Sequence, residues 1–241
     1  MHPAGTDNSR AAEAVADEPS RAYANYVLAV LVLVYVFNFI DRQILAILLQ
    51  PIKDDLGVSD TAMGFLTGLA FALFYTLAGI PIARLADGGT RRTVIAVGVA
   101  VWSAMTAASG LARSFAQLAA ARVGVGVGEA AASPAANSLI SDYFPPERRA
   151  TALAIYNMGA NVGIMFGFFA GAWIGESLGW RAAFALVGLL GAFTTFSTFS
   201  IETLTLMQDA LYLRAVLNIL ISVIACIGAA MLGVVLARQV G

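Results

Sequence analysis

Four charged residues lie in stretches that are otherwise apolar enough to cross a membrane. Asp41 and Arg42 follow the largely apolar run Leu31–Ile40, and Arg122 and Glu129 occupy another such stretch. A charge at bilayer depth costs about 3 kcal/mol even on lenient insertion scales, so these side chains must face a protein interior or a water-filled cavity. Arg122 and Glu129 are seven residues apart and share nearly one helix face. We therefore predict ion pairs between two helices, as Asp41–Arg122 or Glu129–Arg42.

Two interpretations of this charged cluster remain open. It is either a static network of buried ion pairs or part of a transport mechanism. In the second case it is a proton relay or a polar anchor for a substrate, since protonation of a carboxylate releases the arginine that it holds. An enzyme is not expected, because the only histidine is His2, in the polar N-terminal segment.

The chain is far more apolar than a soluble protein of its length. Of its 241 residues, 59% are hydrophobic and 12% are charged, and the mean hydropathy is +0.80. Soluble domains contain about a quarter charged residues. Helices satisfy the backbone of an open chain in lipid, so the expected fold class is an all-α polytopic membrane protein. The expected spans are Tyr23–Leu49, Thr61–Leu85, Thr93–Leu111, Phe115–Ile140, Thr151–Ile174, Ala182–Met207 and Ala210–Leu236.

The positions of the arginines predict the orientation. Arg10 and Arg21 precede the first expected span, and arginine pairs at 91–92 and 148–149 follow the second and fourth. The positive-inside rule then places the N-terminus in the cytoplasm. We expect residues 1–22, which are polar and rich in Ala, Asp and Glu, to be a disordered cytoplasmic tail. The net charge of −1 gives no basic surface for nucleic acid.

Glycines recur at every fourth position along the fifth expected span and just beyond it, from Gly159 to Gly179. This spacing aligns them on one helix face, where the lack of a Cβ lets a neighbouring helix approach closely. Tight packing is the simpler interpretation, and a surface that slides during a transport cycle is the other. Pro51, Pro145-Pro146 and Gly179 mark boundaries between spans.

The loop after the second expected span combines an acidic residue with two arginines. It reads Leu85-Ala86-Asp87 and continues to Arg91-Arg92. An aspartate at a helix end followed by two arginines can form a salt-bridge latch against a neighbouring helix terminus, and an ordinary positive-inside loop is the alternative. The loop resembles the signature of the major facilitator superfamily, although it departs from the usual form at Ala83, Gly88 and Thr90.

Within that superfamily, the chain resembles the Spinster-like carriers of sphingolipids and lysophospholipids. The resemblance rests on Asn38–Arg42, Gly126–Ala130 and Asp142–Arg149 and runs from about residue 23 to 190. It implies a six-helix N-terminal bundle at 23–190 that faces a second six-helix bundle, with alternating access to a site between them. The implied substrate is an amphipathic lipid or small organic solute, the coupling ion is a proton, and the location is the bacterial inner membrane.

The resemblance also implies a role for each matching residue. Asp41 would be the protonation switch with Arg42 as its partner, and Arg122 and Glu129 would be polar groups of the transport cavity. No cofactor is implied beyond the coupling proton. The sequence contains one bundle, so we expect a carrier to require a second copy of the chain or a separate second half. The cytoplasmic gate would comprise Asp87, Arg91 and Arg92.

A Ser/Thr-rich string at residues 194–199, Thr-Thr-Phe-Ser-Thr-Phe, interrupts an apolar span. Its hydroxyl groups compete for backbone hydrogen bonds and favour either local unwinding or a packing face bonded to its own helix. With the later segment Ala215–Ser222, it resembles the broken third helix and the fourth helix of Fluc-type fluoride channels. The resemblance implies a structural sodium ion held by the carbonyls of Gly191 and Thr194. The implied fluoride pore would involve Phe196, Thr198, Phe199, Glu202, Asn218 and Ser222.

Two families therefore meet near residue 190, and a fusion explains both resemblances. The expected parts are the tail 1–22, the bundle 23–190 and a Fluc-like segment 191–241 with a broken helix and one further span. Three functions remain open. They are a carrier, a fluoride channel that obtains its first two helices from a partner, and an inert truncated or fused membrane protein.

Overall fold

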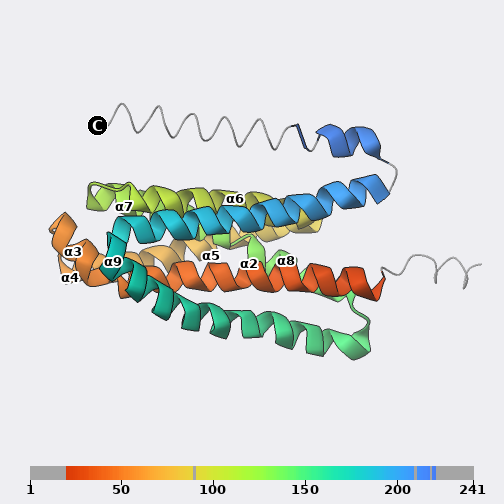
Figure 1. The fold of residues 1–241 in the computed structure, drawn as a ribbon, viewed down its shortest axis with the longest axis horizontal. Helices are drawn as coiled ribbons and strands as arrows, with labels where there is room; N and C mark the ends of the chain where they lie inside the picture. The colour runs from red at the N-terminus through yellow and green to blue at the C-terminus, as the bar shows by residue number, and fades with distance from the viewer. Residues whose placement is uncertain (1–19, 89–90, 209–210, 218, 221–241) are drawn as a thin grey trace, which may run out of the picture. The chain divides into compact units, whose positions relative to one another are not determined.

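The computed structural model describes residues 20–88, 91–208, 211–217 and 219–220. The chain separates into two compact units, one up to Thr195 and one from Phe196. The described part of the first unit is built of helices alone, which lie side by side as a bundle (Figure 1). This is the all-α architecture that the sequence predicts.

Helix α2, Arg21–Ile47, forms the first span. Its N-terminal end is capped by the hydroxyl of Ser20, which accepts a hydrogen bond from the backbone N–H of Tyr23 at 3.3 Å. Helix α2 begins at Arg21, two residues before the expected boundary, and the rest of the expected tail up to residue 19 lies outside the described residues. The short helix α3, Leu49–Leu56, follows and ends at Gly57, whose φ of 63° suits glycine.

The second span contains a π-helical turn. It consists of α4, Asp60–Phe65, the π-helix η1, Leu66–Ala70, and α5, Phe71–Gly88. These three elements follow one another without a loop, so residues 60–86 qualify as one apolar stretch long enough to cross a membrane.

The fourth span is interrupted in its middle. Helix α6, Arg91–Gly110, is followed by α7, Phe115–Glu129, and α8, Ala132–Tyr143. The sequence predicts one helix where the structure has α7 and α8. Pro134 lies four residues after Ala130 and has no N–H to donate to the Ala130 carbonyl, which accounts for the break at this point.

Helix α9, Pro146–Gln208, is bent back on itself at Gly179. Gly179 has φ 83° and ψ 163°, a region open essentially to glycine alone. Residues 146–178 form a first arm, and the second arm begins at Trp180 and runs back in the opposite direction (Figure 1). The predicted boundary at Gly179 is confirmed. The backbone remains helical across 194–198, so the interruption lies at Gly179 and the expected break in the Ser/Thr-rich string is not observed.

Among the described residues, four helical stretches are long and apolar enough to cross a membrane. Candidate spans cover Arg21–Ile47, Asp60–Ala86, Arg91–Gly110 and Pro146–Ala192. The last has 47 residues, about 70 Å of helix, which is more than twice the hydrocarbon thickness of about 30 Å, so the two arms of α9 cross separately. Helices α7 and α8, with 15 and 12 residues, are each too short to qualify alone, so the expected span at 115–140 stays a prediction. The expected seventh span, 210–236, falls mostly outside the described residues.

Two apolar clusters hold the bundle together. One joins α2, α6, α8 and the first arm of α9 and includes Val34, Trp102 and Tyr156. The other includes Ile44 on α2, Leu118 on α7 and Phe184 on the second arm of α9, all with almost no exposed surface. Helix α2 belongs to both clusters, so its position fixes the charged residues that it carries.

The glycines of the first arm of α9 face α2 at close range. A Cβ added at Gly163 would lie 2.4 Å from the Val36 carbonyl oxygen and 2.8 Å from the Phe39 Cβ. A Cβ at Gly167 would lie 2.9 Å from the Gln43 Cβ. This confirms the interpretation of the stripe as a tight packing surface.

Candidate functional site

The four charged residues predicted to pair come together between α2 and α7. Helix α2 contributes Asp41 and Arg42, and α7 contributes Arg122 and Glu129. The Nη1 atom of Arg122 donates to both carboxylate oxygens of Asp41, at 3.1 and 3.0 Å. Asp41 is 0% exposed and Arg122 is 2% exposed. This ion pair is therefore closed off from solvent within the bundle.

The second ion pair has one buried and one accessible partner. The Nε atom of Arg42 donates to the Oε2 atom of Glu129 at 2.7 Å. The Glu129 side chain is 0% exposed, whereas the Arg42 side chain is 30% exposed. Both ion pairs predicted from the sequence are thus confirmed, and Arg42 is the member that a solute can reach.

Aromatic rings surround the accessible guanidinium. The Arg42 Cζ atom lies 5.3 Å from the ring centre of Phe39, 5.1 Å from that of Phe71 and 5.2 Å from that of Tyr75. Rings at this distance attract a cation through their quadrupole. Phe71 and Tyr75 come from α5, so three helices build the surroundings of Arg42. Sequence reasoning missed both rings, because nothing in the local pattern of α5 distinguishes them from other apolar residues.

Each ion pair keeps one unused polar atom. Among the described residues, the buried Nε of Arg122 and the buried Oε1 of Glu129 have no hydrogen-bond partner. A buried donor or acceptor without a partner is costly, so such atoms are uncommon in folded proteins. One is a donor and the other an acceptor, and both lie on the same helix. The arrangement therefore has capacity for an alternative pairing.

The predicted latch residues contact the end of a neighbouring helix. Arg91, at the start of α6, forms an ion pair with Asp142, and Arg92 donates a hydrogen bond to the Tyr143 hydroxyl. Asp142 and Tyr143 end α8. The backbone of Asp87 lies in α5, and its side chain is outside what the structure describes. Asp142 was not predicted as a site residue, although it opens the Asp142–Arg149 motif.

The residues of the channel resemblance are only partly described. Thr194, Phe196, Thr198, Phe199 and Glu202 lie in the helical backbone of α9, and the structure does not describe their side chains. Asn218 and Ser222 lie outside the described residues.

Gly191 is described, and it packs against α6. A Cβ added at this position would lie 2.6 Å from the Ser103 Oγ atom. In the part of the chain that the structure describes, no three His, Cys, Asp or Glu side chains come together as a metal site would require.

Comparison with known proteins identifies the family. Residues 31–204 match the Major Facilitator Superfamily. An MFS-type efflux pump of Mycolicibacterium smegmatis is 39% identical over 170 residues, which cover 70% of this chain and 39% of the pump. The crystal structure of a bacterial homologue of the human lysosomal transporter Spinster, inward-facing and unoccupied, is similar with a TM-score of 0.68 at 39% identity. That similarity covers 76% of this chain and 44% of the other.

A relative of a different family matches a shorter stretch of the chain. A fluoride-specific ion channel, FluC, of Methylococcus capsulatus is 57% identical over 60 residues, which are 25% of this chain and 26% of the channel. The chain spans about two fifths of the length of the pump, 39%, and of the Spinster homologue, 44%. The matched region at 31–204 contains both buried ion pairs, and its apolar helices are those of an integral membrane protein. The chain belongs to the Major Facilitator Superfamily.

Proposed function

We propose that this chain forms the N-terminal half of a proton-coupled carrier that moves an amphipathic lipid or a small organic solute by alternating access. The observation that carries the proposal is the pair of ion pairs between α2 and α7, one closed to solvent and one open at Arg42. Buried ionisable residues in a membrane bundle mark substrate or proton pathways. A purely structural pair would need neither the unused polar atoms nor an accessible arginine.

The proton step uses Asp41. When a proton binds an oxygen of Asp41, the carboxylate becomes neutral and its hold on Arg122 weakens. Arg122 then turns toward Glu129, whose Oε1 atom is an unused acceptor and which already lies in the electrostatic field of Arg122. Glu129 in turn releases Arg42. Protonation of the buried Asp41 thereby frees the charge of the accessible Arg42.

The surroundings of Arg42 support an amphipathic substrate. A guanidinium binds carboxylate or phosphate oxygens with paired hydrogen bonds. The rings of Phe39, Phe71 and Tyr75 place apolar surface next to that cation. A molecule with an anionic group and an apolar part fits this combination.

The second bundle of the carrier comes from a partner in this proposal. The chain matches 44% of the Spinster homologue, which corresponds to one bundle of a two-bundle transporter. A second copy of this chain or a separate second half would complete the transport path. The proposed location is the bacterial inner membrane with the N-terminus in the cytoplasm, as the arginines at 91–92 and 148–149 favour.

Transport by the full chain in liposomes tests the proposal. We expect uptake of a labelled lysophospholipid that depends on an imposed pH gradient and exceeds uptake by protein-free liposomes. Arg42→Gln should reduce this uptake, while Arg113→Gln, at the opposite end of the bundle from Arg91, should not. Uptake equal to that of protein-free liposomes, with or without a pH gradient, would contradict the carrier.

Channel activity is a second candidate, because 57% identity to FluC over 60 residues is a specific similarity. The structural sodium ion at Gly191 and Thr194 belongs to this candidate alone. Fluoride efflux from loaded liposomes, followed with an ion-selective electrode, distinguishes the two. Efflux abolished by Phe196→Ile would support the channel. If the chain supports neither lipid uptake nor fluoride efflux, the result would identify it as an inert fused protein.

A further inference from the structure

A cavity with an excess of arginines lies where α2 begins and where α8 gives way to α9. Its volume is about 310 Å³. Three arginines line it against a single carboxylate, Asp142, which is already paired with Arg91. The remaining lining residues are Ala24, Asn25, Ser141, Tyr143, Phe144, Pro145 and Pro146.

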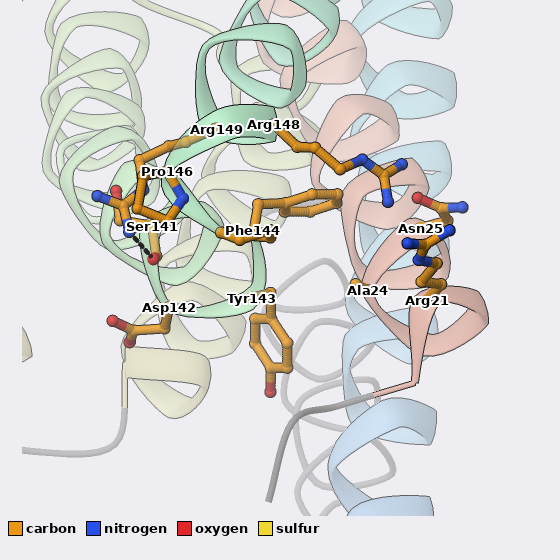
Figure 2. A pocket seen from close by; sticks show the side chains of 11 residues that line it. Arg21, Ala24, Asn25, Ser141, Asp142, Tyr143, Phe144, Pro146, Arg148 and Arg149 are labelled. Carbon is orange, nitrogen blue, oxygen red and sulfur yellow. Dashed lines mark hydrogen bonds between the residues drawn. The ribbon is translucent and has the colours of Figure 1, made fainter. Parts of the chain in front are cut away.

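Two of these arginines come from different helices and converge. Figure 2 shows the Arg148 side chain, from α9, reaching toward Asn25 and Arg21 on α2. Within the described residues, neither Arg21 nor Arg148 forms an ion pair with a carboxylate. Two cations that face one cavity repel each other, and an anion between them removes that repulsion.

The third arginine, Arg149, is held within the chain. Arg149 uses its Nη2 atom to donate to the Ser141 carbonyl at 2.7 Å, as Figure 2 shows. Its Nε atom is buried and has no hydrogen-bond partner among the described residues. The donors that the cavity presents are therefore the two exposed cations and the Asn25 amide. Phosphate oxygens, which accept several hydrogen bonds at once, match this set of donors.

The position of the cavity favours a lipid as the source of the phosphate. Tyr23 and Tyr143 lie beside it with ring centres 5.7 Å apart, and Tyr26 is 44% exposed on the same end of α2. Tyrosines concentrate at the level of lipid headgroups, and basic pockets at the cytoplasmic ends of spans bind anionic headgroups. The apolar part of α2 begins at Val27, directly beyond these rings.

We infer that this cavity binds the phosphate of an anionic phospholipid in the cytoplasmic leaflet, through Arg21 and Arg148. The lipid would join the start of α2 to the start of α9 at a place where the chain itself supplies no ion pair between them. This site is distinct from the charged cluster at Asp41, and its occupancy does not depend on transport activity.

Lipid binding by the full chain in a neutral detergent tests the inference. The probes are short-chain phosphatidylglycerol, short-chain phosphatidylcholine and inorganic phosphate, each titrated against labelled protein. We expect phosphatidylglycerol to bind, and the Arg21→Gln/Arg148→Gln double variant to bind it roughly thirtyfold more weakly, about fivefold for each arginine. The matched control is Arg84→Gln. Arg84 is an exposed arginine near the C-terminal end of α5 and does not line the cavity, so this variant should change affinity less than twofold.

The outcomes separate the sources of the phosphate. Phosphatidylcholine that binds as tightly as phosphatidylglycerol, or equal weakening in Arg84→Gln and the double variant, would overturn the inference. If inorganic phosphate displaces phosphatidylglycerol at micromolar concentration, the cavity is a site for free phosphate, and the inference that it binds a phospholipid is overturned. The thermal unfolding midpoint of the double variant without lipid should match that of the original chain, since neither arginine has an ion-pair partner among the described residues.

Discussion

The Nη1 atom of Arg122 lies 3.1 and 3.0 Å from the two carboxylate oxygens of Asp41, although the two residues are 81 positions apart in the chain. Neither side chain has appreciable exposed surface. This ion pair joins α2 to α7. Several expected outcomes follow from this pair and its surroundings.

Removing both charges of the pair should cost less than the sum of the two single losses. Asp41→Asn leaves the buried Arg122 uncompensated, and we expect the free energy of unfolding to fall by about 3 kcal/mol. The Asp41→Asn/Arg122→Gln double variant replaces the ions with two amides of similar shape and should lose less than the sum of the single variants. Unfolding in detergent for all four proteins measures this coupling. Additive losses would show that the two side chains do not interact.

The same substitution should have opposite effects at two helical glycines. Gly163→Ala places a Cβ 2.4 Å from the Val36 carbonyl, so α2 and α9 must separate, at a cost of about 1–3 kcal/mol. Gly79→Ala, in α5, has nothing within 4 Å and should gain about 0.5–1 kcal/mol because alanine favours a helix. Thermal unfolding of the two variants provides the comparison. A gain at Gly163 would mean that the α2–α9 contact is looser than described.

The latch at the cytoplasmic end should be weak and sensitive to salt. The side chains of Arg91 and Asp142 are 31% and 56% exposed, so solvent screens their attraction. We expect Arg91→Gln to lower the free energy of unfolding by less than about 1 kcal/mol. The loss should shrink further at 1 M salt, where the Debye length is about 3 Å. A loss above this value that persists in high salt would indicate a stronger interaction than an exposed ion pair.

Several features of the site could be predicted from the sequence because they follow from the membrane as solvent. A charge in lipid needs a partner of opposite sign. Because each of two spans carries one arginine and one carboxylate, few ion pairs between the spans were possible. Gly179 was recognisable as a boundary because it separates two apolar stretches. The run of glycines indicated close helix packing for a similar local reason.

Other features depend on neighbours that local patterns do not reveal. Phe71 and Tyr75 surround Arg42 only because α5 packs beside α2, and Asp142 pairs with Arg91 only because α8 ends near the start of α6. Pro134 was visible, but a proline within an apolar run does not state whether the helix bends or continues. The Ser/Thr-rich string at 194–198 was ambiguous for a related reason. Its hydroxyl groups are compatible with a helix as well as with a break.

The central claim is that protonation of Asp41 drives a carrier, and proton flux tests it most directly. The full chain is reconstituted in liposomes with a trapped pH-sensitive dye, and lysophospholipid is added outside. We expect lipid-stimulated proton flux that is lost in Asp41→Asn and retained in Asp54→Asn, which makes the same change at an exposed position of α3. Flux of equal size in Asp41→Asn, or no stimulation by lipid in the original chain, would contradict the account.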